Sequence, residues 1–366
     1  MTSGRVEPRL TIRGLRVRAL DLALARPVET ASGVMRTTPL VLIDLTTDEG
    51  IVGRSYVRCY TSLALKPLAD LIGNLEPLVA GDAVAPFAIE RKLQRQFRLL
   101  GAQGLTGIAI AGIEMALWDA RAKACDVPLV TLLGGEPKPV RAYASLRTMN
   151  PHAAAAEAEE LARLGFTAVK VKIGRADLAA DLATIRAVRG AIGEEIALMV
   201  DYNQCLSVAE AIARVQVLDD EGLTWIEEPT RADDFAGHAR IAKAARTPIQ
   251  LGENWWGPSD AAKSIAANAS DHVMLDVMKL GGVAAWLRAA ALADAASLPA
   301  SSHTFPELSA HLLGVTPTAA WLEYLDHAGP ILAEPVRVEN GYAWPSDRPG
   351  TGIAWDEAAI AAASAR

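Results

Sequence analysis

The stretch "FTAVKVKIG", residues 166–174, places two lysines two positions apart inside a run that otherwise reads as a buried β-strand. The side chains of a strand alternate between its two faces, so Lys170 and Lys172 point to the same side. Lysine is among the residues least often buried without a partner. The pair therefore indicates that this strand carries a polar site into an otherwise apolar interior.

Short apolar runs of this kind recur through the second part of the chain. They are centred near residues 143, 170, 200, 226, 251, 275, 301 and 323. Their spacing of roughly 22 to 30 residues, with Ala-rich amphipathic segments in most gaps, is typical of βα units. Eight strands so spaced predict a parallel barrel. A doubly wound sheet would give a similar alternation, but it would not by itself explain why nearly every strand ends in a polar residue.

The first part of the chain has a different pattern. "LRVRALDLAL" (15–24) and "PLVLIDLTTDEGIVGRSY" (39–56) predict strands, with a turn at "DEG". The polar, Gly-containing stretch "RPVETASGVMRTTP" (26–39) between them reads as a loop. From about Ser62 to Ala124 the spacing of the apolar residues becomes helical. Strands followed by helices predict an α+β domain.

Length, charge and cysteine usage exclude several classes of protein. A chain of 366 residues is long enough for two domains. Its net charge of -7, without a local basic cluster, argues against a nucleic-acid partner. Cys59, Cys125 and Cys205 are scattered, which suits a reducing cytoplasm and no structural zinc. The N-terminus lacks the apolar core of a signal peptide, and charges interrupt every apolar stretch before membrane-spanning length. We therefore expect a cytoplasmic protein with no membrane segment.

The ends of the predicted barrel strands carry ionisable and polar side chains. In barrel enzymes the active site lies at the C-terminal ends of the strands. An ordinary structural role, such as that of a surface carboxylate that caps the next helix, would explain any single one of these residues, but their coincidence on seven strands predicts one shared site. The residues are Lys170, Lys172, Asp201, Asn203, Glu227, Glu228, Glu253, Asn254, Asp276, His303 and Glu323.

Three of these residues predict a metal site. Asp201, Glu227 and Glu253 end three consecutive predicted strands. Carboxylates that converge without a cation repel one another and raise one another's pKa values. An oxygen-only set suits a hard ion, and Mg²⁺ is the usual choice when water or substrate completes the coordination shell. We therefore predict Mg²⁺, with Mn²⁺ as a possible substitute; the alternative is that one or two of the three cap helices.

The remaining ionisable residues predict proton transfer. Asp276 and His303 end adjacent strands, and a carboxylate beside an imidazole makes a general acid/base. Lys172 would approach a central substrate from another side, and a base on each face of one carbon is the geometry of racemisation. Lys170 and the metal ion would lower the pKa of Lys172 toward neutrality, while Lys170 stays charged and neutralises a substrate carboxylate.

The size of the rate enhancement that an enzyme needs also supports the metal site. General acid/base catalysis supplies about 10²- to 10⁴-fold, whereas enzymes commonly need about 10⁶-fold or more. Removing a proton next to a carboxylate creates a dianionic enolate, so electrostatic stabilisation must provide most of the remainder. Glu323, if its setting keeps it protonated, could donate a hydrogen bond to the second carboxylate oxygen.

As a group these motifs resemble the enolase superfamily, and the mandelate racemase subgroup in particular. The resemblance implies an α/β barrel of the modified (β/α)7β type with an N-terminal α+β capping domain. It implies a cap at 1–135, a barrel at 136–330 and a C-terminal segment at 331–366 that returns to the cap. The motifs that carry it are "VKVKIG", "VDYNQ", "WIEEPT", "GENW", "LDVMKLGGV", "SSHTFPELSAHLL" and "WLEYLD".

The resemblance also implies a role for each site residue. Lys172 looks like the base for one enantiomer, and His303 paired with Asp276 looks like the base for the other. Asp201, Glu227 and Glu253 look like the metal ligands. The residues expected to contact the substrate are Glu323 as the acid at the carboxylate, Lys170 as its neutralising cation, Asn203 at the hydroxyl and Ser145 as a further carboxylate contact.

One departure from the family concerns the tail of the substrate. The cap covers this tail, and mandelate racemase presents an apolar wall to a phenyl ring there. In this chain "SGVMRTT" (32–38) and "SYVRCYTS" (55–62) carry Arg36 and Arg58 beside Met35 and Tyr60. We expect Arg36, Arg58 and Tyr60 to contact the substrate, with Arg36 on a loop that could close over it. If both arginines instead face solvent, the tail is unconstrained.

Three functions are compatible with these residues. The first is a racemase of a mandelate-like 2-hydroxy acid, which is the function we expect. The second is an acid-sugar dehydratase of the same subgroup, which forms the same enolate but expels a β-hydroxyl. The third, a non-catalytic barrel scaffold, fits poorly with an intact set of carboxylates, lysines and histidine. The expected partners are a small-molecule carboxylate and further copies of the chain in a homo-oligomer.

Overall fold

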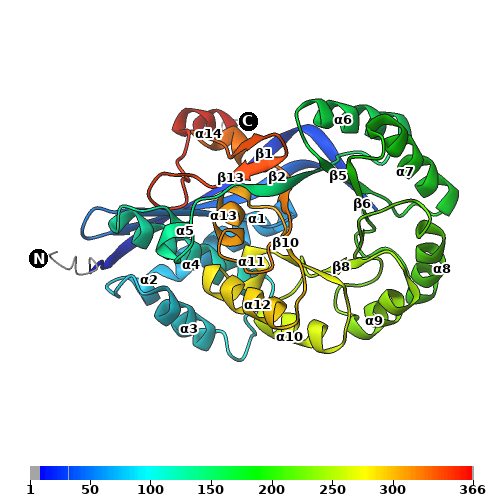
Figure 1. The fold of residues 1–366 in the computed structure, drawn as a ribbon. Coiled ribbons are helices and arrows are strands. Elements are labelled where there is room, and N and C mark those ends of the chain that lie inside the picture. The colour runs from blue at the N-terminus through cyan, green and yellow to red at the C-terminus, as the bar shows by residue number, and fades with distance from the viewer. Residues whose placement is uncertain (1–8, 32, 365–366) are drawn as a thin grey trace, which may run out of the picture.

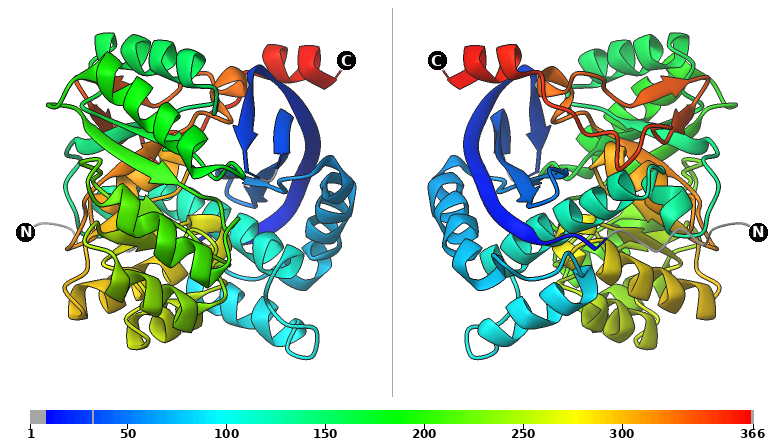
Figure 2. Two further views of the ribbon diagram at one scale, coloured as in Figure 1. Left: turned by 90° about the vertical axis from the view of Figure 1, so that its right-hand side faces the viewer. Right: turned by 90° about the vertical axis from the view of Figure 1, so that its left-hand side faces the viewer.

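The computed structural model describes residues 9–31 and 33–364. It contains an antiparallel sheet near the N-terminus and a parallel barrel formed by the middle of the chain (Figure 1). The cap, drawn in blue and cyan in Figure 2, lies beside the barrel. No described helix combines the length and apolar character needed to cross a membrane.

The sheet of the cap has the strand order β1 (Ile12–Thr30), β2 (Gly33–Thr47) and β3 (Val52–Arg58). Its central strand β2 is buried on both faces from residue 38 to 45. On one side it meets α4 (Leu105–Ala124), which is apolar all round and almost wholly buried. Gly53 on the neighbouring strand β3 lets α4 approach the sheet closely, because a Cβ atom there would lie 2.0 Å from the backbone oxygen of Ala116.

The predicted loop at residues 26–39 is wrong. Strands β1 and β2 continue through it as a hairpin arm, with Val28 opposite Met35 and Thr30 opposite Gly33. The register of β1 shifts between Ala23 and Val28. This irregularity and the largely exposed surface of the arm remove the alternation of apolar and polar residues that normally reveals a strand.

The helices of the cap follow the sheet, as the spacing between Ser62 and Ala124 predicted. They pack against the sheet and against one another. They are η1 (Ser62–Ala64), α1 (Leu65–Asn74), α2 (Glu76–Val79), α3 (Pro86–Gln96) and α4, followed by α5 (Leu129–Leu132).

The predicted barrel is confirmed. Each strand pairs in parallel with the next from β4 to β10, and β11 pairs with β4. The N–H of Ser302 donates to the oxygen of Trp321 at 2.9 Å and joins β10 to β11, which closes the ring and excludes a doubly wound sheet. The strands are β4 (Val140–Ser145), β5 (Ala168–Lys172), β6 (Ala197–Asp201), β7 (Ile226–Glu227), β8 (Ile249–Leu251), β9 (His272–Leu275), β10 (Ala300–Ser302) and β11 (Leu322–Tyr324).

Helices alternate with these strands and cover the outside of the barrel (Figure 1). Polar side chains begin several of them: Ser207 and Glu210, for example, form a reciprocal capping box at α8. The helices are α6 (Pro151–Arg163), α7 (Leu178–Ile192), α8 (Val208–Leu218), α9 (Phe235–Ala244), α10 (Pro258–Ala266), α11 (Val277–Leu280), α12 (Val283–Ala295) and α13 (Pro306–Leu313).

The C-terminal part of the chain connects the barrel with the cap. It contains η2 (Gly329–Ile331), β12 (Arg337–Glu339), β13 (Tyr342–Trp344) and α14 (Glu357–Ser364). Strand β13 pairs antiparallel with β4 of the barrel, and α14 packs on β1 of the cap. Glu357 there lies 2.6 Å from Nη1 of Arg18.

Candidate active site

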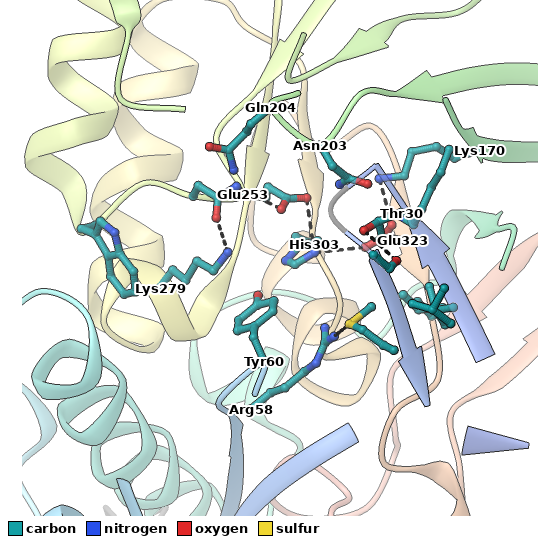
Figure 3. A pocket seen from close by; sticks show the side chains of 18 residues that line it. Thr30, Arg58, Tyr60, Lys170, Asn203, Gln204, Glu253, Lys279, His303 and Glu323 are labelled. Atoms are coloured by element: carbon teal, nitrogen blue, oxygen red, sulfur yellow. Dashed lines mark hydrogen bonds and ion pairs between the residues drawn. The ribbon is translucent and has the colours of Figure 1, made fainter. Parts of the chain in front are cut away.

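A cavity of about 540 Å³ opens where the hairpin arm of the cap meets the C-terminal ends of the barrel strands (Figure 3). Both parts of the chain contribute side chains to it. The cap supplies Val28, Thr30, Gly33, Val34, Met35, Arg58 and Tyr60, and the rest of the chain supplies Lys170, Lys172, Asn203, Gln204, Glu253, Asn254, Trp256, Lys279, His303, Glu323 and Leu325.

The three predicted metal ligands come together at the barrel side of this cavity. Asp201, Glu227 and Glu253 each offer one carboxylate oxygen, and these oxygens lie within 4.8 Å of one another. All three residues are buried. Burial raises the pKa of Glu227 to about 7, and the neighbouring carboxylates add to this effect, although Lys170 opposes it. A buried, oxygen-only set of this spacing fits one hard divalent cation.

The two lysines of β5 point to the same side and reach this carboxylate cluster. Nζ of Lys170 lies 2.5 Å from Oε1 of Glu227 and 2.9 Å from Oε1 of Glu323. Nζ of Lys172 lies 3.2 Å from Oδ2 of Asp201. Burial lowers the pKa of Lys170, but the neighbouring acidic groups, Glu227 first among them, raise it well above its ordinary value. Lys170 therefore carries its charge at neutral pH.

His303 and Asp276 form a tight pair. Nδ1 of His303 lies 2.6 Å from Oδ2 of Asp276, and Nε2 faces the cavity 3.3 Å from Oε2 of Glu253. Burial lowers the pKa of His303, but Glu253 and Asp276 raise it above its ordinary value overall. The imidazole thus has one nitrogen fixed by a carboxylate and the other directed at the metal-ligand cluster.

Lys172 and His303 stand on either side of the metal ligands. Lys172 lies on β5, next to β6, and His303 follows β10. The ligands come from β6, β7 and the end of β8, which lie between these strands in the order of the barrel. Two groups that can accept protons therefore approach one space from different directions.

The neighbours of Glu323 do not favour the protonated form on which its expected role as an acid depends. Burial raises its pKa, but Lys170, His303 and Lys172 together lower it below the ordinary value. The carboxylate accepts a hydrogen bond from the N–H of Thr304 at 3.1 Å. Cationic neighbours therefore outweigh the effect of burial and favour the ionised form of Glu323.

Asn203 and Ser145 occupy different positions relative to the cavity. Asn203 lines it, with Nδ2 donating to Oδ2 of Asp201 at 2.9 Å and with its buried Oδ1 free of hydrogen bonds to described residues. Ser145 lies beside Lys170 in the register of β4 and β5 and is buried. It is not one of the residues that line the cavity.

The structure separates the two arginines of the cap. Arg58 is buried and lines the cavity together with Tyr60. Arg36 is exposed on β2 and is not one of the residues that line the cavity, so the structure does not bring it to the site as expected. The reason is that residues 33–47 form a strand, in which Met35 faces the cavity and its neighbour Arg36 must face away.

Sequence reasoning missed Lys279. This buried residue lines the cavity, donates a hydrogen bond to Oδ1 of Asn254 and lies 4.5 Å from the ring centre of Tyr60. Asn254 in turn donates to Oε2 of Glu228 at 2.7 Å. The signal was available in "LDVMK", where a lysine three positions after Asp276 shares the turn that follows the strand.

The backbone around the cavity adopts conformations that most residues avoid. Non-glycine residues with positive φ include Tyr60 at 57°, Asn203 at 45° and Thr304 at 47°. Glu228, which follows a metal ligand, has φ 38°. Strained conformations of this kind cluster at functional sites, because the surrounding structure must hold them in place.

Comparison with known proteins identifies the family. Residues 12–134 match the N-terminal domain of mandelate racemase / muconate lactonizing enzyme, and residues 153–359 match the enolase C-terminal domain-like family. The chain is 34% identical over 265 residues to an L-talarate/galactarate dehydratase of Salmonella typhimurium, which spans 71% of this chain and 66% of that enzyme. It is 31% identical over 342 residues to a 3,6-anhydro-alpha-L-galactonate cycloisomerase of Streptomyces coelicolor, covering 90% and 93% of the two chains.

A solved structure is similar over nearly the whole length. It is an enolase from Bradyrhizobium complexed with magnesium and mandelic acid, 46% identical, with a TM-score of 0.93 and coverage of 98% of this chain and 99% of that one. The magnesium in that structure and the carboxylate cluster described above identify Mg²⁺ as the cofactor. The chain belongs to the mandelate racemase / muconate lactonizing enzyme family of the enolase superfamily.

Proposed function

We propose that the protein is an Mg²⁺-dependent racemase of a mandelate-like 2-hydroxy acid. The observation that carries this proposal is the placement of Lys172 and His303 on either side of the metal-ligand strands, facing one cavity. The Bradyrhizobium structure, which contains mandelic acid, supports the substrate class.

Binding of the substrate would use the charges at the barrel side of the cavity. Mg²⁺ held by Asp201, Glu227 and Glu253 supplies positive charge that stabilises the enolate form of a carboxylate. Lys170, which is charged, would neutralise the same carboxylate. The free Oδ1 of Asn203 would accept a hydrogen bond from the 2-hydroxyl group.

Proton transfer would then need one group on each face of the α-carbon. Lys172 in its neutral form takes the α-proton of one enantiomer, and His303 delivers a proton to the opposite face through Nε2. The other enantiomer reacts in the reverse direction. Asp276 holds Nδ1 of the imidazole at 2.6 Å and so leaves Nε2 as the nitrogen that exchanges protons with the substrate.

A second candidate is an acid-sugar dehydratase. It would form the same enolate and lose a β-hydroxyl group, with His303 as the general acid. Two observations favour it: Arg58 and Lys279 make the cap side of the cavity polar, and the chain is 34% identical to an L-talarate/galactarate dehydratase.

A screen of 2-hydroxy acids and sugar acids with the Mg²⁺-loaded protein in D₂O distinguishes these candidates. If the protein is a racemase, the acid gains deuterium at Cα and its solution loses optical rotation, and no keto acid forms. A dehydratase forms a keto acid. If no acid shows Mg²⁺-dependent exchange or loss of water, both proposals are wrong and a non-catalytic barrel is favoured instead. The cytoplasmic location and the homo-oligomer stay predictions of the sequence.

A further inference from the structure

A buried arginine faces the cavity from the cap without an acidic partner. Arg58, the last residue of β3, is 4% exposed. Its Nη2 donates to the sulfur of Met35 at 3.3 Å, and its Nε has no hydrogen-bond partner among the described residues. Within the described part of the chain, Arg58 forms no ion pair with a carboxylate. A buried charge in this state is costly unless a partner of opposite charge binds it.

Several other largely buried cations of the chain are paired with carboxylates. Nη1 of Arg214 lies 3.0 Å from Oδ2 of Asp181, and Nζ of Lys123 lies 2.5 Å from Oδ2 of Asp119. At the other end of the cavity, Lys170 is in contact with several carboxylates. Arg58 and its neighbour Lys279 therefore differ from these paired cations.

Two further donors lie next to Arg58. The guanidinium carbon of Arg58 is 4.4 Å from the ring centre of Tyr60, and Nζ of Lys279 is 4.5 Å from the same centre. The hydroxyl of Tyr60 is buried and has no hydrogen-bond partner among the described residues. Lys279 donates to Asn254 and forms no ion pair with a described carboxylate at salt-bridge distance.

These donors occupy one end of the cavity. In Figure 3, Arg58 and Tyr60 lie on the cap side of His303, whereas Asn203 and Glu253 lie on its other side. The metal-ligand end holds several carboxylates, while Arg58 brings an unpaired positive charge to the cap end. A substrate that spans the cavity would thus place its reacting carboxylate at one end and its tail beside Arg58.

We propose that the cap end binds a second carboxylate, so that the preferred substrate is a 2-hydroxy dicarboxylic acid. This inference rests on the proposed function, in either its racemase or its dehydratase form. A guanidinium binds a carboxylate through two parallel N–H groups, and the unpaired Nε of Arg58 with a terminal nitrogen provides such a pair. The hydroxyl of Tyr60 provides a third donor. The phenyl tail of mandelate itself would leave these donors without an acceptor, so the inference narrows the proposed class of 2-hydroxy acids to those with an acidic tail.

The test compares acids that share a carbon skeleton and differ at the far end. Suitable pairs are 2-hydroxyglutarate with 2-hydroxyvalerate, and galactarate with galactonate. Dissociation constants for the Mg²⁺-loaded protein are measured by calorimetry, and Cα exchange is measured in D₂O. We expect the diacid of each pair to bind about tenfold more tightly than its monoacid.

Variants assign this preference to Arg58. Arg58→Met should reduce the ratio of the monoacid to the diacid dissociation constant to about one, and Arg58→Lys should retain part of the preference for the diacid. Arg16→Met removes the same charge from an exposed position on β1 and should leave the preference intact. If Arg58→Met fails to fold, two measurements still test the inference: the binding of both acids to Arg58→Lys, and their binding to the unmodified protein.

The outcomes separate this inference from the proposed function. Arg58-dependent diacid binding without any exchange would contradict the function and support the inference. Exchange with monoacids as good as with diacids would support the function and overturn the inference. Equal binding of galactarate and galactonate, both better than 2-hydroxyvalerate, would assign a neutral hydroxylated tail and also overturn it.

Discussion

Asp276 uses its two carboxylate oxygens for two different purposes. Oδ1 accepts the N–H groups of Met278 and Lys279, each at 2.8 Å, at the start of α11. Oδ2 faces Nδ1 of His303 at 2.6 Å. Because backbone groups hold one oxygen, the other can orient the imidazole without moving itself. The direction of Nε2 toward the cavity is thus fixed by the turn that follows β9.

The two-base proposal predicts separable half-reactions. His303→Asn should abolish racemisation but leave exchange of the α-proton of one enantiomer with D₂O. Lys172→Ala should leave exchange of the other enantiomer. In each variant the affected exchange should fall by about 10²-fold or more, the usual range for a lost general base. NMR of each pure enantiomer in D₂O measures the two rates separately.

The control for this prediction is the metal site. Both variants should bind Mg²⁺, because neither residue is one of the three clustered ligands. If both variants lose exchange of both enantiomers equally while they still bind Mg²⁺, one proton-transfer group serves both faces and the two-base proposal is wrong.

At the scale of single residues, the sequence predicted which side chains meet at the site better than their ionisation states or the directions in which they point. Lys172, Asp201 and His303 could be placed there because each ends or follows a buried apolar run, and the ends of barrel strands meet at one mouth. The ionisation state of Glu323 could not be predicted, because it depends on distances to Lys170 and His303 that no sequence pattern encodes.

Among the secondary-structure elements, Glu114 connects the cap with the barrel. It lies on α4 and accepts the N–H groups of Val283 at 2.7 Å and Ala284 at 2.9 Å, the first residues of α12. It also accepts the indole N–H of Trp118 at 2.6 Å. The start of α12 has no side-chain cap of its own, so this carboxylate takes that role from another part of the fold.

We therefore predict that Glu114→Ala destabilises the protein by about 3 kcal/mol, because it leaves buried donors without an acceptor. The shift of the urea unfolding midpoint measures the loss. Glu159→Ala, which removes an exposed carboxylate from α6, is the matched control and should change stability little. Equal stability of the two variants would show that Glu114 does not support α12.

His311 on α13 predicts a dependence of stability on pH. Its Nδ1 accepts the N–H of Val130 and its Nε2 lies 3.3 Å from the oxygen of Thr351. Burial lowers its pKa to about 4 from the ordinary 6.5. Between these two pH values the unfolded chain binds a proton at His311 that the folded chain does not bind. The contribution of His311 to the stability of the fold is therefore full above pH 6.5 and is lost as the pH falls toward 4. The loss is about 3 kcal/mol at most.

Unfolding curves between about pH 7 and pH 4 test this prediction. His311→Gln keeps an acceptor and a donor but does not titrate. Other buried histidines also contribute to the pH dependence. The relevant quantity is therefore the difference in free energy of unfolding between the unmodified protein and the His311→Gln variant. That difference should shrink as the pH falls. A constant difference across the range would contradict the lowered pKa.

For the whole molecule, the barrel could be predicted from sequence and the cap side of the cavity could not. Nearly every barrel strand repeats the same sequence pattern, which is an apolar run that ends in a polar residue. The hairpin arm has no such repetition. Whether Met35 or Arg36 faces the substrate depends on a register that shifts after Ala23, and a shift of one residue exchanges the two faces of a strand.

The metal site gives the last prediction, which concerns the entire fold. Asp201, Glu227 and Glu253 come from three neighbouring strands, so one ion links β6, β7 and the end of β8. An ion that binds only the folded chain stabilises it, by about 2.7 kcal/mol at 100 times its dissociation constant. Chelation should therefore abolish activity and lower Tm, and Mg²⁺ or Mn²⁺ should restore both. Glu227→Gln should weaken metal binding and abolish the rise of Tm with Mg²⁺, whereas Glu159→Ala should keep it. Full activity after complete chelation, or an unchanged Tm response in Glu227→Gln, would mean that these carboxylates do not hold the ion.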